Sequence, residues 1–284
     1  MIASDKELSS RKERRKMGKA LRQKVSFSSH GEWKPLADRP DPLSLLHAQD
    51  KGRLEYLLPI KYGRMVASPF AFLRGSAIVM AADLAQTPVS GIQVILCGDA
   101  HLSNFGVFAT PERKLVFDLN DFDEAYPGPW EWDLKRLAAS AAVAGRQLGF
   151  KDKNNRKLAQ LVARVYRKAM RQFSKQAILD VWYYHVEADQ VLKLFEDYSK
   201  KGAKSTQRML KKARTKTQEV TLEKLTEFVG GRRRFINEPP LLVRLNDLLD
   251  EGQRAHITPE YVEKSWFEYL SSLPEERRLL LSRF

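Results

Sequence analysis

The alternation of apolar and polar residues divides the chain into a basic leading segment, a short region of strands and a long helical part. Residues 76–84 form an alanine-rich run that predicts a helix. Apolar runs at 93–97 and 114–117 predict buried strands, because Gly98 and Asp118 end them abruptly. Three further elements are expected around them: an apolar segment at 104–108, a turn at 110–113 and a loop at 121–130.

Helical periodicity dominates the chain after Trp132. Apolar residues recur at steps of three and four between Leu158 and Phe173, which predicts a long amphipathic helix. The same spacing predicts further helices at 180–199, 203–229, 241–249 and 259–270, with Gly230-Gly231 ending the second of them. The chain is therefore expected to be α+β, with a small β-hairpin region feeding a mostly helical body.

Composition excludes several classes of protein. With 284 residues, of which 43% are hydrophobic, the chain can bury a sizeable core. It has no run of about 18 apolar residues that would span a membrane, and no apolar stretch after its first charges that would form a secretory signal. Its single cysteine, Cys97, cannot form an intramolecular disulfide. We therefore predict a cytoplasmic location and a buried, structural role for this thiol.

Positive charge is concentrated in two segments of a chain whose formal net charge is +14. Residues 1–39 hold eleven Lys and Arg against five Asp and Glu, and residues 200–235 hold twelve against three, so the remainder is close to neutral. Such segments suit nucleic acid or an acidic partner, or simply form solvated surfaces. We expect residues 1–40 to be a mobile segment with a basic helix over 11–24, and residues 41–284 to form the domain.

Candidate catalytic residues lie in polar segments that follow the predicted strands. Asp99, His101 and Asn104 come directly after the first strand, and Asp121 comes shortly after the second. Taken alone, the first group also suits an Asx-rich turn that satisfies its own backbone. Because loops after neighbouring strands of a hairpin region can meet at one edge, we expect these side chains to converge.

Phosphoryl transfer explains why these residue types would be needed together. Its transition state is loose and highly charged, so catalysis depends on positioning and charge neutralisation. Asp99 is the candidate to orient an acceptor hydroxyl and take its proton, and His101 the candidate to tie the loop or assist proton movement. Mg²⁺ prefers hard oxygen ligands, which Asn104 and Asp121 offer, with Asp118 as the competing carboxylate.

Three motifs carry a resemblance to a known superfamily: GDxHxxN at 98–104, DFDEA at 121–125 and WDL at 132–134. They resemble the aminoglycoside phosphotransferase and choline kinase branch of the kinase-like proteins. That resemblance implies a protein-kinase-like C-lobe that uses Mg²⁺ and ATP. It also implies that Asp99 is catalytic, that Asn104 and Asp121 bind the metal ion, and that Asp133 braces the site.

Four longer segments resemble a bacterial family known as domain of unknown function 2252: SPFAFLRGSA at 68–77, GDAHLSNFG at 98–106, NDFDEA at 120–125 and WEWDLKRLAAS at 130–140. This resemblance extends through most of residues 55–284. It implies kinase-like chemistry on an acceptor that the motifs do not identify.

A working kinase also needs a glycine-rich turn over the phosphates and a lysine that contacts them. No GxGxxG precedes Asp99, so Lys61 is the candidate lysine and Arg74 a candidate phosphate clamp. The resemblance implies that the glycine-rich segment follows the helical region, and the chain ends at Phe284. We therefore expect the nucleotide-binding lobe to be absent or incomplete and the chain to be a truncated member.

Two other functions are alternatives. A metal-dependent phosphoesterase would use Asp99, His101, Asp118 and Asp121, although such enzymes usually have several histidine ligands. A non-catalytic module would bind nucleic acid or an acidic partner through the basic segments and keep the kinase-like site as a relic.

Overall fold

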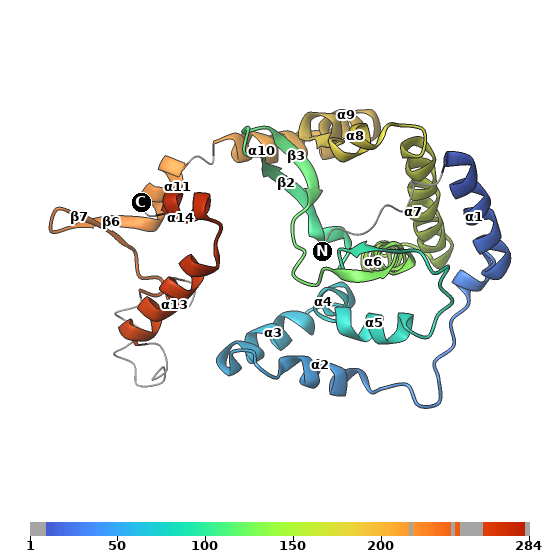
Figure 1. Ribbon diagram of the computed structural model, residues 1–284, viewed down its shortest axis with the longest axis horizontal. Coiled ribbons are helices and arrows are strands. Elements are labelled where there is room, and N and C mark those ends of the chain that lie inside the picture. Colours follow the sequence, from blue (N-terminus) through green and yellow to red (C-terminus); the bar gives the residue numbers. More distant parts are fainter. Residues whose placement is uncertain (1–9, 216–217, 240–241, 245–257, 282–284) are drawn as a thin grey trace. The chain divides into compact units, whose positions relative to one another are not determined.

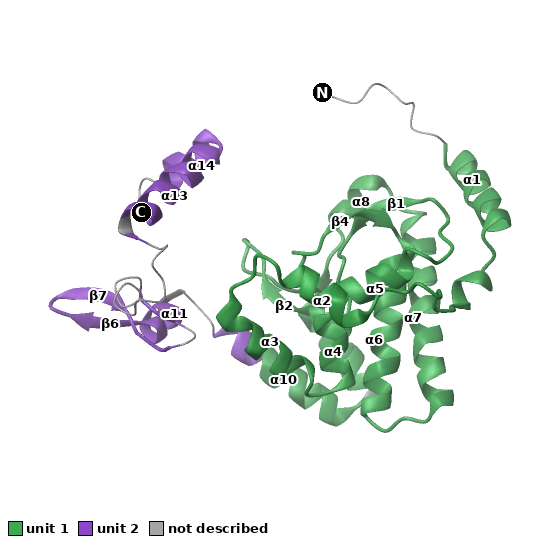
Figure 2. Ribbon diagram, turned by 90° about the horizontal axis from the view of Figure 1, so that it is seen from below, with its two compact units in different colours: residues 1–210 green, residues 211–284 purple. Residues whose placement is uncertain are grey.

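Helices make up most of the chain and short antiparallel strands add to them, which confirms the predicted α+β class (Figure 1). The computed structural model describes residues 10–215, 218–239, 242–244 and 258–281. The chain forms two compact units, residues 1–210 and 211–284 (Figure 2). The boundary expected after residue 40 stays a prediction.

The first unit begins with helices that precede the strands. The predicted basic helix is present as α1 (Arg11–Lys24), and Ser10 caps it together with Glu13 in a capping box. Four short helices and two 3-10 turns follow: α2 (Pro42–Asp50), α3 (Leu58–Met65), α4 (Pro69–Gly75), α5 (Ala77–Leu84), Ser29–Gly31 and Glu55–Leu57. The last of these α-helices confirms the prediction at 76–84.

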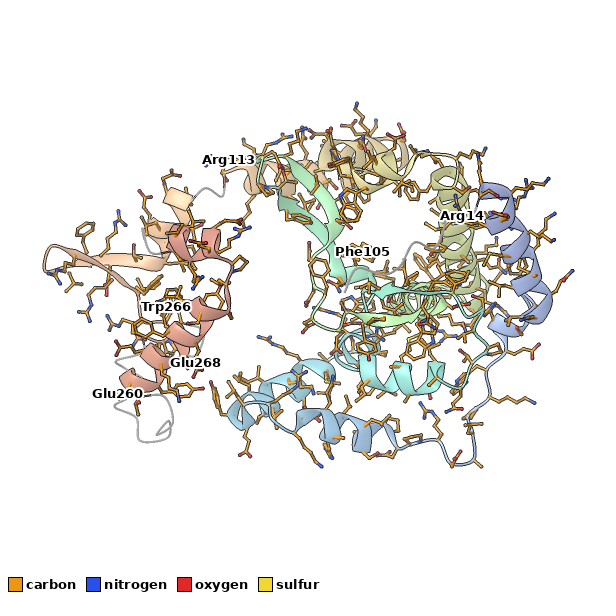
Figure 3. All side chains as sticks on the ribbon, in the orientation of Figure 1. Arg14, Phe105, Arg113, Glu260, Trp266 and Glu268 are labelled. Carbon is orange, nitrogen blue, oxygen red and sulfur yellow. The ribbon has the colours of Figure 1, made fainter. Side chains whose placement is uncertain are left out.

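The central strands form one long hairpin whose ladder is interrupted in the middle. The two ladders are β1 (Gln93–Leu96) with β4 (Tyr126–Pro129), and β2 (Phe105–Ala109) with β3 (Leu115–Leu119). Phe105, labelled in Figure 3, stacks on Phe117 across the second ladder, with ring centroids 6.3 Å apart. The predicted turn at 110–113 joins β2 to β3. Residues 97–104 lead from the first ladder to the second, and residues 120–125 lead back; we call these two stretches the crossing segments.

One strand, β4, was predicted as a loop, and that prediction is wrong. Its Pro127 lacks a backbone N–H, which weakens any sequence signal for a strand. Within the part of the chain that the structure describes, the segment pairs with β1 alone, so the missing donor is tolerated at this edge. A Cβ on Gly128 would lie 2.5 Å from Leu96 Cδ1. Because glycine has no Cβ, the buried Leu96 packs directly on the backbone of β4.

Two long helices, α6 (Glu131–Gln147) and α7 (Asp152–Phe173), pack against each other (Figure 2). They approach closely because Gly145 lies where a Cβ would come within 2.3 Å of Asn155 Oδ1. Trp130 stacks almost parallel on Tyr166 with centroids 5.5 Å apart, which joins the start of α6 to α7. The predicted amphipathic helix is therefore confirmed.

The prediction of one continuous helix over 180–199 is wrong, because the middle of the segment is not helical. The segment forms α8 (Ile178–Trp182), strand β5 (Val186–Glu187) and α9 (Ala188–Tyr198). The interruption arises because Val186 and Glu187 pair with β3, which extends the β2–β3 ladder to three strands. This long-range pairing overrides the local helical pattern.

The predicted helix at 203–229 is also interrupted. It comprises α10 (Lys200–Arg214), α11 (Gln218–Leu225) and strand β6 (Thr226–Val229), which pairs with β7 (Arg232–Phe235). Gly230 and Gly231 both have positive φ, at 59° and 79°, and form the two-residue hairpin turn that glycine favours.

The C-terminal helices are α13 (Pro259–Ser272), which confirms the prediction at 259–270, and α14 (Glu275–Leu281). The predicted helix at 241–249 lies largely outside the described residues. Within the described part of the chain, no helix combines the length and the apolar composition needed to cross a bilayer.

Candidate active site

The candidate site lies where the central hairpin is interrupted. Residues 97–104 leave β1 and lead into β2, and residues 120–125 leave β3 and lead into β4. Because β1 pairs with β4 and β2 pairs with β3, the two crossing segments run past each other. Asp99, His101, Asn104 and Asp121 all lie in them, so the topology brings the predicted residues into one region.

Gly98 allows the two crossing segments to touch. Its φ is +82°, a left-handed conformation that residues with a Cβ rarely adopt. A Cβ on Gly98 would also lie 2.0 Å from the carbonyl oxygen of Glu124. The close approach of segment 97–104 to residues 121–125 therefore favours glycine at this position.

Asn104 joins the two segments. Its side chain is buried, and its Nδ2 donates to the carbonyl oxygens of Asp99, at 3.1 Å, and Asp121, at 2.9 Å. The backbone N–H of Asn120 donates to the carbonyl oxygen of Asn104 at 3.0 Å. Because its nitrogen donates to both carbonyls, the side-chain amide of Asn104 has a fixed orientation. Its oxygen lies on the side of the amide group away from these two hydrogen bonds.

Cys97 lies next to the contact that Asn104 makes between the two segments. Its thiol is buried, as predicted, and donates to the carbonyl oxygen of Asp121 at 3.6 Å, while Asn104 Nδ2 lies 3.7 Å from its Sγ. Burial raises the pKa of this thiol, so it stays protonated and acts as a packing group.

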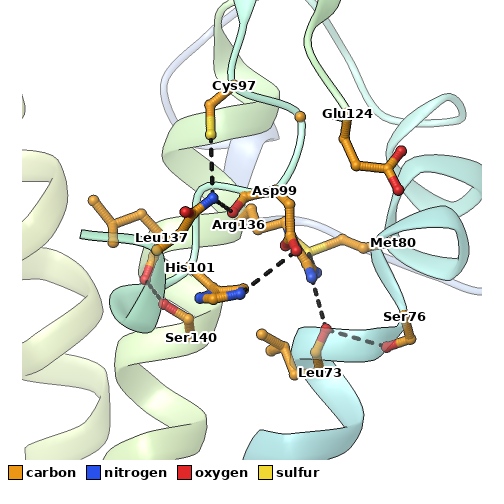
Figure 4. Close-up of polar contacts among 12 residues, drawn as sticks. Leu73, Ser76, Met80, Cys97, Asp99, His101, Glu124, Arg136, Leu137 and Ser140 are labelled. Carbon is orange, nitrogen blue, oxygen red and sulfur yellow. Dashed lines mark hydrogen bonds and ion pairs between the residues drawn. The ribbon is translucent and has the colours of Figure 1, made fainter. Parts of the chain in front are cut away.

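Asp99 is held by two positively charged or polar partners. Its Oδ1 accepts from Arg136 Nε at 2.5 Å, and its Oδ2 lies 3.5 Å from His101 Nε2. Arg136 is itself buried, and its Nη2 donates to the carbonyl oxygen of Leu73, the residue before Arg74 on α4, at 2.6 Å. The carboxylate of Asp99 is thus fixed against α6 while keeping some solvent exposure (Figure 4).

His101 is buried between this carboxylate and α4. Its ring packs edge-on to Phe70, and its Nδ1 has no hydrogen-bond partner in the described part of the chain. Burial is the largest influence on this group and lowers its pKa, the charge of Asp99 opposes that shift, and the charges of Arg136 and Arg74 reinforce it. His101 is therefore held neutral in the folded protein.

This shift predicts a loss of stability in acid. The unfolded chain takes up a proton near the ordinary pKa of 6.5, whereas the folded chain does so only at lower pH. The free energy of unfolding should therefore fall below pH 6.5, by up to about 1.4 kcal/mol per pH unit, until the lowered pKa is reached. Denaturant titrations at pH 7.5 and 5.5 measure this fall, and His101→Asn should reduce it; an unchanged fall would contradict the prediction.

Three side chains on one face of α6 hold the first crossing segment, residues 97–104. The carboxylate of Asp133 accepts from the backbone N–H groups of Cys97, at 2.7 Å, and Gly98, at 3.1 Å. Ser140 Oγ accepts from the N–H of Leu102 at 3.1 Å. Arg136, between them in sequence, holds Asp99. These spacings of three and four residues place all three side chains on one helical face.

The predicted brace at Asp133 has a direct test. Asparagine at this position has an NH2 group in place of one carboxylate oxygen, so one of the two backbone N–H groups faces a donor and loses its acceptor. We expect Asp133→Asn to lower the free energy of unfolding by about 2 kcal/mol, measured by urea denaturation. Asp118→Asn is the matched control, because Asp118 is exposed and, among the described residues, its carboxylate accepts only from the next N–H, that of Leu119; it should cost less than about 0.5 kcal/mol. Equal losses would contradict the assignment.

The other predicted residues are placed differently. Asp118 lies in β3 opposite Gly106. Asp121 presents its backbone to Asn104 and has an exposed side chain. Lys61 on α3 pairs with Asp50 on α2 at 2.5 Å, and Arg74 is exposed at the end of α4, within electrostatic range of His101. In the described ranges, no group of three or more His, Cys, Asp and Glu side chains is placed to share a metal ion.

Arg136 and Ser140 were missed by the sequence reasoning. Both lie inside the quoted segment WEWDLKRLAAS, and both follow Asp133 at helical spacing, which was the available signal. A buried arginine needs an acidic partner, but the sequence does not show which carboxylate supplies it.

Comparison with known proteins gives one family. The family described as "Uncharacterized protein conserved in bacteria (DUF2252)" matches residues 53–284, which includes both crossing segments and α6. No curated protein and no solved structure matches the chain.

Proposed function

The chain belongs to the DUF2252 family of proteins conserved in bacteria, and we propose that it carries the catalytic half of a kinase-like phosphotransferase site. In this proposal the region from β1 to α7 corresponds to a kinase-like C-lobe. The reaction would move the γ-phosphoryl group of ATP to the hydroxyl of an acceptor.

The observation that carries the proposal is the bridge made by Asn104. A single buried amide, that of Asn104, joins the backbone of Asp99 to that of Asp121, which lies 17 residues after Asn104 in sequence. An Asx-rich turn that satisfied only itself would not need the second segment. The bridge joins the backbones that carry Asp99 and Asp121, which supports the proposal that their carboxylates and the amide oxygen of Asn104 act on one bound phosphoryl group.

Asp99 is proposed as the proton acceptor. As the acceptor oxygen bonds to the γ-phosphorus, the bond from phosphorus to the bridging oxygen of ADP breaks, and the hydroxyl proton passes to Asp99. Arg136 fixes the orientation of this carboxylate through Oδ1. His101, held neutral, lies 3.5 Å from Oδ2 and adds no positive charge beside it.

Asn104 and Asp121 are proposed to hold Mg²⁺. Their donor atoms are hard oxygens, and Mg²⁺ usually takes one or two such ligands from the protein together with phosphates and water. The fixed amide of Asn104 fits this role, because its nitrogen already donates to two carbonyls. When bound, the ion would neutralise charge on the phosphates. Asp121 is preferred to Asp118 because its backbone contacts Asn104.

Two basic residues are candidates for contacts with the phosphates. Arg74, exposed near His101, is proposed to contact phosphate. Lys61 is a weaker proposal because its ammonium pairs with Asp50. The phosphoesterase alternative has less support, since His101 faces Asp99 and the carboxylate of Asp118 accepts from the backbone N–H of Leu119.

A ligand-binding experiment tests the proposal. Mg²⁺ with ATP should raise the Tm of the purified protein, and neither Mg²⁺ nor ATP alone should do so equally. Asp121→Asn should remove this stabilisation, whereas Asp118→Asn, the matched control, should retain it. Asp99→Asn should keep nucleotide binding but lower phosphoryl transfer by about a hundredfold or more. Stabilisation that survives Asp121→Asn would contradict the proposed metal site.

A further inference from the structure

A third basic segment lies outside the two found from the overall charge. Residues 153–179 contain eight Lys and Arg and no Asp or Glu. Acidic residues elsewhere hide this excess in the total charge. The segment covers nearly all of α7 and reaches the start of α8.

The basic side chains of α7 form a stripe on the face turned away from α6. Successive residues of a helix turn by about 100°, so spacings of seven, four and three align Lys157, Arg164, Lys168 and Arg171. All four are exposed. The opposite face carries Asn155, which meets Gly145 of α6, and Tyr166, which stacks on Trp130. The stripe therefore presents positive charge on the face of α7 that is turned away from α6.

Apolar side chains are exposed directly beyond the end of this stripe. On and after α8, the exposed fractions are 73% for Ile178, 66% for Leu179, 79% for Trp182 and 72% for Tyr183. The ring of Tyr184 packs against Phe173, at 4.9 Å between centroids, which ties this segment to the end of α7. Four large apolar side chains this exposed within six residues form a patch of the kind that marks an interaction site.

We propose that the α7 stripe and the α8 apolar residues together bind the surface of an anionic lipid bilayer. The basic side chains would contact lipid phosphates, and each Lys or Arg near such a surface strengthens binding. Trp and Tyr favour the interface between headgroups and acyl chains, and Ile178 and Leu179 gain by leaving water. Nucleic acid would use the basic stripe but would leave these aliphatic side chains exposed, so a bilayer fits both features.

Vesicle binding tests this proposal on the full chain. Sedimentation compares vesicles of phosphatidylcholine with vesicles in which about a quarter of the lipid is phosphatidylglycerol. The protein should bind the anionic vesicles, and the Trp182 fluorescence, obtained as the difference from Trp182→Phe, should shift to shorter wavelength. The triple variant Arg164→Gln, Lys168→Gln, Arg171→Gln should bind at least about tenfold more weakly, and Trp182→Ser should also weaken binding.

The matched control removes three exposed positive charges elsewhere, with Arg232→Gln, Arg233→Gln and Arg234→Gln in β7. It should bind as the unmodified protein does, and circular dichroism should show that each variant is folded. Three results would overturn the proposal: no binding to anionic vesicles at low salt, equal losses in the α7 and β7 variants, or a preference for duplex DNA over vesicles that the α7 variant abolishes.

Discussion

Replacing Gly98 by alanine is expected to lower the free energy of unfolding by more than about 4 kcal/mol. Two effects add at this position. The φ of +82° disfavours any residue with a Cβ, and the new atom would lie 2.0 Å from the carbonyl oxygen of Glu124. Relief of that contact requires the two crossing segments to separate, which would also break the Asn104 bridge. Urea denaturation of the purified variant measures the loss.

Gly91→Ala separates the two effects. Gly91 has a similar φ of +87°, but a Cβ there would meet no atom within 4 Å. Its replacement should therefore cost only the conformational strain, about 1 to 2 kcal/mol. Similar losses for both variants would show that the segments 97–104 and 120–125 do not pack as closely as described.

Replacing Arg136 by methionine is expected to destabilise the fold by about 3 to 5 kcal/mol. Methionine keeps much of the apolar stem but leaves the carboxylate of Asp99 without its charged partner and the carbonyl of Leu73 without its donor. Asp99→Asn should lower the cost of the arginine substitution, because the neutral amide needs no buried cation. A double-mutant cycle by urea denaturation measures this coupling.

Arg146→Met provides the control on the same helix. Arg146 also meets an aspartate through Nε, with Asp152 at 3.4 Å, but both side chains are largely exposed, at 66% and 73%. Exposed pairs contribute little, so the control should cost less than about 1 kcal/mol. A small effect of Arg136→Met, or no coupling with Asp99, would contradict the role assigned to this ion pair.

The proximity of the candidate residues could be predicted from the sequence because local signals indicated the strands. Two apolar runs before Gly98 and Asp118 predicted them, although β3 continues through Asp118 to Leu119 and most of β1 is exposed rather than buried. Hairpin pairing then brought Asn104 next to Asp121. Which of Asp118 and Asp121 approaches Asn104 depended on the register of β2 with β3, which residue spacing alone did not give.

Other features depended on contacts between distant segments. The strand at 126–129 exists because it pairs with β1 and packs on Leu96, although its own residues include two prolines and a glycine. The ion pair of Arg136 joins residues 37 positions apart. The Gly230-Gly231 hairpin, in contrast, carried a local signal, since two glycines between short runs predict a tight turn more strongly than a helix end.

The most direct test of the central claim replaces Mg²⁺ by paramagnetic Mn²⁺ in the presence of ATP and follows backbone amide signals by NMR. Signals from residues 97–104 and 120–125 should broaden first. Asp121→Asn should abolish this broadening, while Asp118→Asn should preserve it. Broadening centred on another part of the chain, or unchanged broadening in the Asp121→Asn variant, would contradict a metal–nucleotide site held by Asn104 and Asp121.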